Sequence, residues 1–187
     1  MEINGKITGI DLMPKDKGVT VYYTDNVEEH GENTYKEYNV KVFRQPSDNL
    51  KTILRTLVGH AIYCLGLSNG KLNEPEFKSR KIVDMPVFKN FRFSGFKING
   101  DGEEEKLIVK MKLEDINHQE VALTSGKIGI ADGTYAFDEL LASDMDQVIE
   151  EVKNFIKGEN YYRQTALEFP KEEKKKSKKS VDHEDDL

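Results

Sequence analysis

The sequence predicts an α+β, β-rich domain shaped as an OB-fold-like barrel, and three observations lead to this prediction. Alternating apolar and polar stretches, separated by turn-forming residues, flank one long apolar stripe of helical period. Their order is three strands, a helix and two or more strands, which is the order of an OB fold. A C-terminal helical stripe and a charged segment follow. A split α+β sheet with both helices on one face is an alternative.

The first three strands are predicted from alternation of side chains along residues 3–12, 19–24 and 35–44. The first ends before Pro14, and a polar loop around His30 separates the second from the third. Valine, threonine and tyrosine dominate the second strand and suit a pleated, half-buried surface.

Two helices are predicted from apolar residues spaced three and four apart. The first covers residues 48–65, with Ser47 or Asp48 as N-cap. The second begins at Ser143, whose hydroxyl can cap, and ends at Gly158.

Further strands are predicted between these helices, over residues 88–98, 107–113 and 120–124, with a short one near 128–130. Residues 99–102 form the turn of a hairpin, because Asn and Gly tolerate positive φ. A long polar connection over residues 72–86 suggests a functional loop.

Composition limits the class of protein. There are 28 Lys and Arg against 34 Asp and Glu, which gives a net charge of −6 and disfavours a protein that coats duplex DNA by charge alone. A local basic groove stays compatible with this balance. One cysteine can form no internal disulfide, and no signal peptide or spanning segment is evident, so we expect a cytoplasmic protein without membrane contact.

We expect one domain over residues 1–169 and a disordered tail over residues 170–187. The tail has almost no apolar residues and cannot offset its ordering entropy. Its charges are mixed, with lysines first and acidic residues last.

Phenylalanines alternate with cations over residues 87–97. Aromatic rings that stack on bases, beside cations that hold phosphates, are typical of proteins that bind single strands without sequence preference. The alternative is that Phe91 and Phe93 are core residues and that a bulge at Gly95 changes the direction of Phe96. The predicted DNA site consists of Tyr22, Lys41, Phe43, Arg44, Lys89, Arg92, Phe96 and Lys97.

Gln164, Leu167 and Phe169 have the spacing Gln-x-x-Leu-x-Phe. This segment resembles the short peptide by which many bacterial and phage replication and repair proteins bind the sliding clamp. The resemblance implies that Gln164 bonds at the rim of a pocket while Leu167 and Phe169 fill an apolar cleft. Alternatively, Leu167 and Phe169 belong to a last strand that packs on the sheet.

The chain ends with acidic residues, including Asp185 and Asp186, before Leu187. This end resembles the acidic C-terminal tips of bacterial and phage single-stranded DNA-binding proteins, which recruit partner enzymes and compete with DNA. Leu187 stands where those tips usually carry an aromatic residue, and the lysines before the tip are a further difference. A plain solvated appendage is the alternative.

Enzyme motifs such as a P-loop, G-x-S-x-G or H-E-x-x-H are missing from the sequence, and no cofactor or metal is expected. Asp84, Glu104 and Lys106 only loosely match the carboxylates and lysine of metal-dependent nucleases.

These features together predict a non-enzymatic, single-stranded DNA-binding protein of a phage-type replication or recombination system. Its expected partners are single-stranded DNA and a sliding clamp or other replication proteins, while the sequence does not predict its oligomeric state. A non-enzymatic structural or adaptor protein is the second hypothesis, with Phe96, Tyr35 and Phe43 as contacts, and a nuclease is the third.

Overall fold

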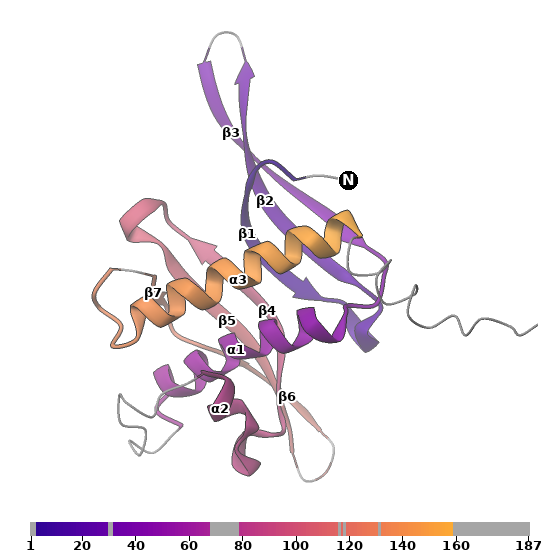
Figure 1. The fold of residues 1–187 in the computed structure, drawn as a ribbon, viewed down its shortest axis with the longest axis vertical. Helices are drawn as coiled ribbons and strands as arrows, with labels where there is room; N and C mark the ends of the chain where they lie inside the picture. Colours follow the sequence, from indigo (N-terminus) through magenta and orange to yellow (C-terminus); the bar gives the residue numbers. More distant parts are fainter. Residues whose placement is uncertain are drawn as a thin grey trace, which may run out of the picture.

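The computed structural model describes residues 3–29, 32–67, 79–115, 117, 119–130 and 132–158 of the 187-residue chain. This part forms an open antiparallel sheet of seven strands, with the long helices α1 and α3 on one face (Figure 1). The strands lie in the order β3-β2-β1-β4-β5-β6, and β7 pairs with β5. The strands are β1 (Lys6–Leu12), β2 (Val19–Glu29), β3 (Glu32–Val42), β4 (Phe91–Asn99), β5 (Lys106–Glu114), β6 (Glu120–Thr124) and β7 (Ile128–Gly129). The helices are α1 (Asp48–Cys64), the short α2 (Ser79–Asp84) and α3 (Asp138–Lys157).

The α+β class is confirmed, but the sheet does not close into the predicted OB-fold-like barrel. Strands β3 and β6 remain its two edges. The physical reason is the two-layer core: a barrel buries the inner faces of its strands against one another, whereas here one face of the sheet packs on α1 and α3. The alternative with both helices on one face describes this arrangement better.

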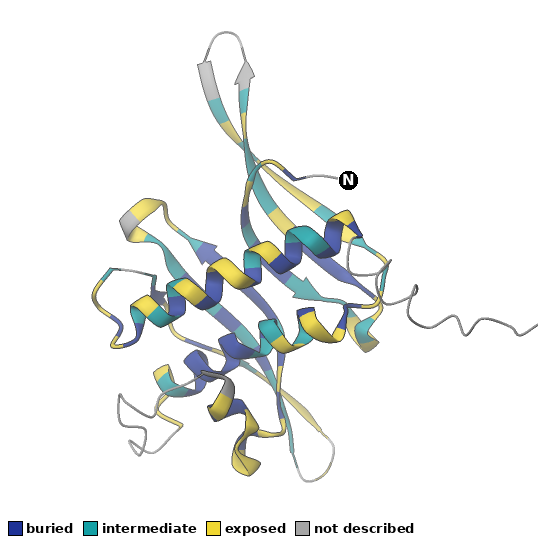
Figure 2. Cartoon of the chain, viewed as in Figure 1, coloured by how far each residue is buried: buried dark blue, intermediate teal, exposed yellow. Residues whose placement is uncertain are grey.

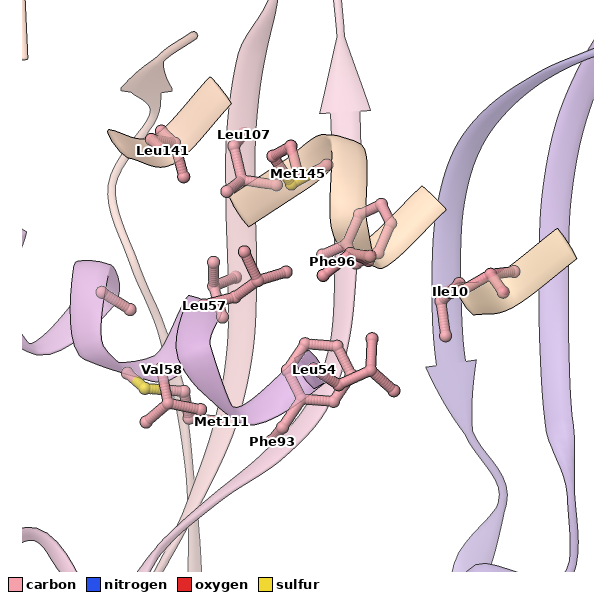
Figure 3. Close-up of a cluster of buried hydrophobic side chains, with 14 of the residues drawn as sticks. Ile10, Leu54, Leu57, Val58, Phe93, Phe96, Leu107, Met111, Leu141 and Met145 are labelled. Carbon is pink, nitrogen blue, oxygen red and sulfur yellow. The ribbon is translucent and has the colours of Figure 1, made fainter. Parts of the chain in front are cut away.

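Burial separates the two faces of the sheet. Figure 2 shows dark blue residues where the helices and the sheet face each other, and exposed residues on the outer sides of both helices. Leu54, Leu57 and Val58 of α1 meet strand residues such as Leu107 and Met111 there (Figure 3). The apolar stripes of the helices and alternate strand positions therefore form one core.

A bulge in β4 determines which side its phenylalanines face. The register against β5 shifts between Phe93 and Gly95. The extra residue brings Phe96 to the same side of the sheet as Phe91 and Phe93, and all three are buried. A regular strand would have placed Phe96 on the opposite side.

The ends of the helices show two confirmed predictions and one wrong prediction. Ser47 caps α1, because its Oγ accepts a hydrogen bond from the Leu50 N–H at 3.1 Å. Gly158 ends α3 with a left-handed φ of 87°, as predicted. The start of α3 is Asp138, not Ser143, because Leu141 extends the buried stripe towards the N-terminus.

The predicted strands over 120–124 and near 128–130 are confirmed as β6 and β7. Part of the expected polar connection forms α2, and residues 68–78 lie outside the described residues. Residues 159–187, including the predicted tail, also lie outside them. Within the described part, no helix is long and apolar enough to cross a membrane.

Candidate nucleic-acid interface

The face of the sheet away from the helices carries a groove of about 1150 Å³ over β1, β2, β3 and β4. Ile10 and Val21 are opposite each other in the register and are fully buried on the helix side. Because side chains alternate along a strand, Asp11 and Tyr22 point to the other side, into the groove. We call this side the uncovered face.

A row of three residues crosses the floor of this groove. Gly9 of β1 is paired with Tyr22 of β2 on one side and with Lys97 of β4 on the other. Neighbouring strands lie about 4.8 Å apart, so Tyr22 and Lys97 flank a gap about 10 Å wide between their backbones. Gly9 leaves this gap without a side chain.

Gly9 lies close to the backbone of β4 and to the ring of Tyr22. A Cβ atom added to Gly9 would lie 2.9 Å from the carbonyl oxygen of Phe96 and 3.5 Å from Cδ2 of Tyr22. Glycine therefore lets the backbone of β1 lie close to β4 and lets the Tyr22 ring approach the backbone of β1. The row offers a planar aromatic surface next to a cation.

The Tyr22 ring is held in place by its hydroxyl group. This hydroxyl donates a hydrogen bond to Oδ2 of Asp11 at 3.1 Å. Burial raises the pKa of Tyr22, and the bond to Asp11 acts in the same direction. The phenol is therefore neutral at physiological pH.

Two of the cations on the uncovered face have their charge unpaired. Lys97 and Lys41 are exposed, and neither forms an ion pair with any residue that the structure describes. Lys110 instead binds Oδ1 of Asp11 at 2.8 Å, and Lys6 binds Oε1 of Glu105 at 2.7 Å. Acidic residues therefore balance part of the groove. Lys97 is the exposed cation that lines the groove without an ion pair to the described residues, and Lys41 lies outside the groove on the same face.

Four of the predicted DNA-site residues share the uncovered face: Tyr22, Lys41, Arg92 and Lys97. Arg92 lies further along β4 and binds Oε2 of Glu114 at 2.7 Å. Phe43 is 79% exposed beyond the end of β3, and Lys89 is exposed just before β4. Neither Phe43 nor Lys89 lines the groove, and of the four residues on the uncovered face only Tyr22 and Lys97 do.

Two predicted site residues face the helices instead. The Phe96 side chain is 1% exposed and lies in the core, because the bulge in β4 turns it inward, so it cannot stack on a base. The Arg44 guanidinium lies 4.5 Å from the centre of the Phe155 ring of α3. Arg44 therefore forms a cation–π contact on the helix side, away from the groove.

The residues of the nuclease hypothesis take separate partners. Asp84 ends α2 and lies 3.6 Å from the guanidinium of Arg55, Glu104 lies in the turn between β4 and β5, and Lys106 binds Asp132. No group of three or more His, Cys, Asp or Glu residues in the described ranges could hold a metal ion. The arrangement gives the nuclease hypothesis no geometric support.

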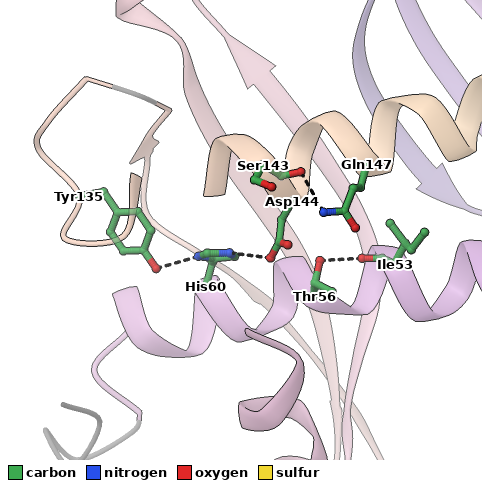
Figure 4. A network of polar contacts seen from close by, with 7 residues as sticks. All are labelled: Ile53, Thr56, His60, Tyr135, Ser143, Asp144 and Gln147. Atoms are coloured by element: carbon green, nitrogen blue, oxygen red, sulfur yellow. Dashed lines mark hydrogen bonds and ion pairs between the residues drawn. The ribbon is translucent and has the colours of Figure 1, made fainter. Parts of the chain in front are cut away.

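A buried polar cluster joins the two long helices (Figure 4). His60 of α1 is fully buried, with Nδ1 2.9 Å from the Tyr135 hydroxyl and Nε2 3.1 Å from Oδ2 of Asp144 of α3. Burial raises the pKa of Tyr135. Because none of the three residues lines the groove, we interpret the cluster as a polar link between the helices.

Sequence reasoning missed both Gly9 and the His60 cluster. A glycine inside a strand pattern is a known sign of close backbone approach, so Gly9 could have been found. The partners of His60 lie 75 and 84 residues away in the sequence, and no local spacing points to them. The predicted clamp and tip residues, Gln164, Leu167, Phe169, Asp185, Asp186 and Leu187, lie outside the described residues.

Comparisons with models of protein families, with curated proteins and with solved structures find no match to this chain. The groove and its residues are therefore the basis for the functional argument.

Proposed function

We propose that the protein binds single-stranded DNA across the uncovered face of the sheet, as part of a phage-type replication or recombination system. The observation that carries this proposal is the row of Tyr22, Gly9 and Lys97 on the floor of the groove. An exposed ring, an open gap and an unpaired cation are the parts that a stacked base and its phosphate need.

In this mechanism a base stacks on Tyr22 above Gly9, and the phosphate that follows lies near Lys97. Stacking of one base on one ring contributes about 1–3 kcal/mol. Lys41 pairs with Thr20, which lies two residues before Tyr22 on β2 and on the same face of the sheet. Lys41 therefore extends the path of the phosphates. Single strands fit better than a duplex, because paired bases cannot expose their faces to the ring.

The groove also contains acidic side chains, including Asp11 and Glu37. These carboxylates repel phosphates, so binding is modest and depends strongly on salt. With these carboxylates and a net charge of −6, the chain binds DNA only at the cations beside Tyr22 and not over its whole surface.

The tail completes the proposal. Its acidic end, with Asp185, Asp186 and Leu187, competes with DNA for the groove and binds partner proteins when DNA displaces it. Gln164, Leu167 and Phe169 bind the sliding clamp. Both roles follow from the resemblances described above.

Fluorescence anisotropy of a labelled oligo-dT with the full chain at two salt concentrations tests the proposal, with duplex DNA of equal length as competitor. Tyr22→Ala should weaken binding about 5- to 150-fold, the equivalent of one stacked base. Lys97→Glu should lower the slope of log affinity against log salt by about 0.7 for the lost phosphate contact.

Two control variants make the outcome specific. Tyr22→Phe keeps the ring and loses only the bond to Asp11, so it should bind nearly as well as the native chain. Lys81→Glu makes the same charge change as Lys97→Glu on α2, which packs against α1, and should leave the salt slope unchanged. Equal losses of oligonucleotide affinity in Lys81→Glu and Lys97→Glu would show that binding depends only on the net charge of the chain.

The second candidate function is a non-enzymatic adaptor that binds proteins. Its supporting observation is the exposure of two large aromatic side chains, Tyr35 and Phe43, each 79% exposed. Absence of oligonucleotide binding at low salt, also after removal of residues 181–187, would favour this function.

A further inference from the structure

The outer edge of β3 is unusually open to pairing. This strand has 11 residues and pairs with β2 without a shift in register, and no strand in the described ranges pairs with its other side. Natural edge strands are blocked by short length, by proline, by bulges or by charged side chains, especially lysine. Strand β3 has none of the first three devices and carries charges of both signs, whereas the opposite edge strand, β6, has only 5 residues.

We propose that β3 pairs with β3 of a second copy of the chain, antiparallel and centred on Asn39. The two open sheets then form one continuous sheet with a two-fold axis at Asn39. This inference goes beyond DNA binding and does not depend on it. In the dimer Lys41 pairs with Glu37 of the second copy, and Lys97 alone remains to bind phosphate in the groove.

Charge complementarity fixes the centre of the pairing. Residues at equal distances from Asn39 on either side lie opposite each other, so Glu37 of each copy faces Lys41 of the other. Both side chains are exposed, and neither has an ion-pair partner in the part of the chain that the structure describes. Opposite charges directly across two strands stabilise the pairing, and the symmetry forms this pair twice.

The same register brings together the two exposed aromatic residues. Tyr35 lies four residues before Asn39. Phe43 lies four residues after it, directly beyond the end of β3, so extending the pairing by one residue places the Tyr35 ring of each copy opposite the Phe43 ring of the other. Each is 79% exposed in one copy, and pairing removes part of this apolar surface from water. On the helix side, Tyr38 comes opposite the half-buried Val40.

Within one chain these charges cannot satisfy each other. Glu37 and Lys41 face Thr24 and Thr20 of β2. They are four residues apart on one strand, a distance of about 13 Å. Any effect of exchanging the two charges on association therefore reports contact between copies.

Sedimentation equilibrium of the full chain over a range of concentrations, without DNA, tests the proposal. Lys41→Glu turns both attractive pairs into repulsive ones and should weaken dimerisation about 10- to 100-fold. The double variant Glu37→Lys with Lys41→Glu exchanges the charges and should restore the dimer. Lys81→Glu, which makes the same charge change on α2, should dimerise like the native chain.

Cross-linking tests the register itself. In a Cys64→Ser background, Asn39→Cys places two thiols opposite each other, with Cα atoms about 5 Å apart, which a disulfide can span. In Glu37→Cys the two thiols are offset along the strands by four residues, about 13 Å, and should not cross-link.

Three results would overturn the proposal: a monomer at every concentration, a charge exchange that fails to restore the dimer, or equal cross-linking of Asn39→Cys and Glu37→Cys. Because Tyr22 and Lys97 lie outside this contact, loss of DNA binding in their variants leaves the dimer intact, and the two proposals can fail separately.

Discussion

Replacement of Phe96 by alanine distinguishes a core residue from a DNA contact. The Phe96 side chain is 1% exposed and its ring centre lies 6.5 Å from that of Phe93. Burial of such a ring removes about 150–200 Å² from water, which at about 25 cal/mol per Å² corresponds to about 4–5 kcal/mol. Measured losses for buried Phe→Ala are about 3–5 kcal/mol, so we expect this decrease in the free energy of unfolding.

Urea unfolding followed by far-ultraviolet circular dichroism measures this decrease, since the chain has no tryptophan. Phe43→Ala is the matched control: it makes the same chemical change at a side chain that is 79% exposed, and should cost less than about 1 kcal/mol. Phe96→Leu keeps most of the volume and should fold and bind oligo-dT like the native chain. Equal, small losses in Phe96→Ala and Phe43→Ala would refute the placement of Phe96 in the core.

Three other predictions follow from the structure. Asp144→Ala removes a buried acceptor from His60 and should lower the free energy of unfolding by about 1–3 kcal/mol in the same urea assay. Desolvation raises the pKa of the Cys64 thiol to about 11, although the residue as a whole is exposed, so alkylation by iodoacetamide at pH 8.5 should be slower in the folded chain than in urea. Removal of residues 181–187 should tighten oligonucleotide binding, most strongly at low salt, and unchanged affinity in the anisotropy assay would contradict competition by the tip.

Local patterns predicted most of the elements, because their signals lie within a few residues of each other. The cap at Ser47 and the left-handed glycine at Gly158 are examples, since a cap depends on one turn of helix. The start of α3 was predicted too late, because Ser143 resembles a cap although the apolar stripe already includes Leu141. The first turn instead has Asp138, whose carboxylate accepts bonds from nearby backbone N–H groups.

The candidate site was harder to predict, because it depends on contacts between distant strands. Tyr22, Gly9 and Lys97 come together only when β1 pairs with both β2 and β4. One bulge residue in β4 decided whether Phe96 faced the groove or the core. Closure of the sheet was also a non-local property, set by where the helices pack rather than by the order of strands.

The central place of β1 has a consequence for the order of folding. Strands β1, β2 and β3 form neighbouring hairpins and can pair soon after they are synthesised. The other edge of β1 pairs with β4, where Gly9 meets Lys97, 88 residues later in the chain. The outer edge of β1 therefore stays unpaired until β4 has been synthesised and pairs with it, and this long-range step should limit the rate of folding.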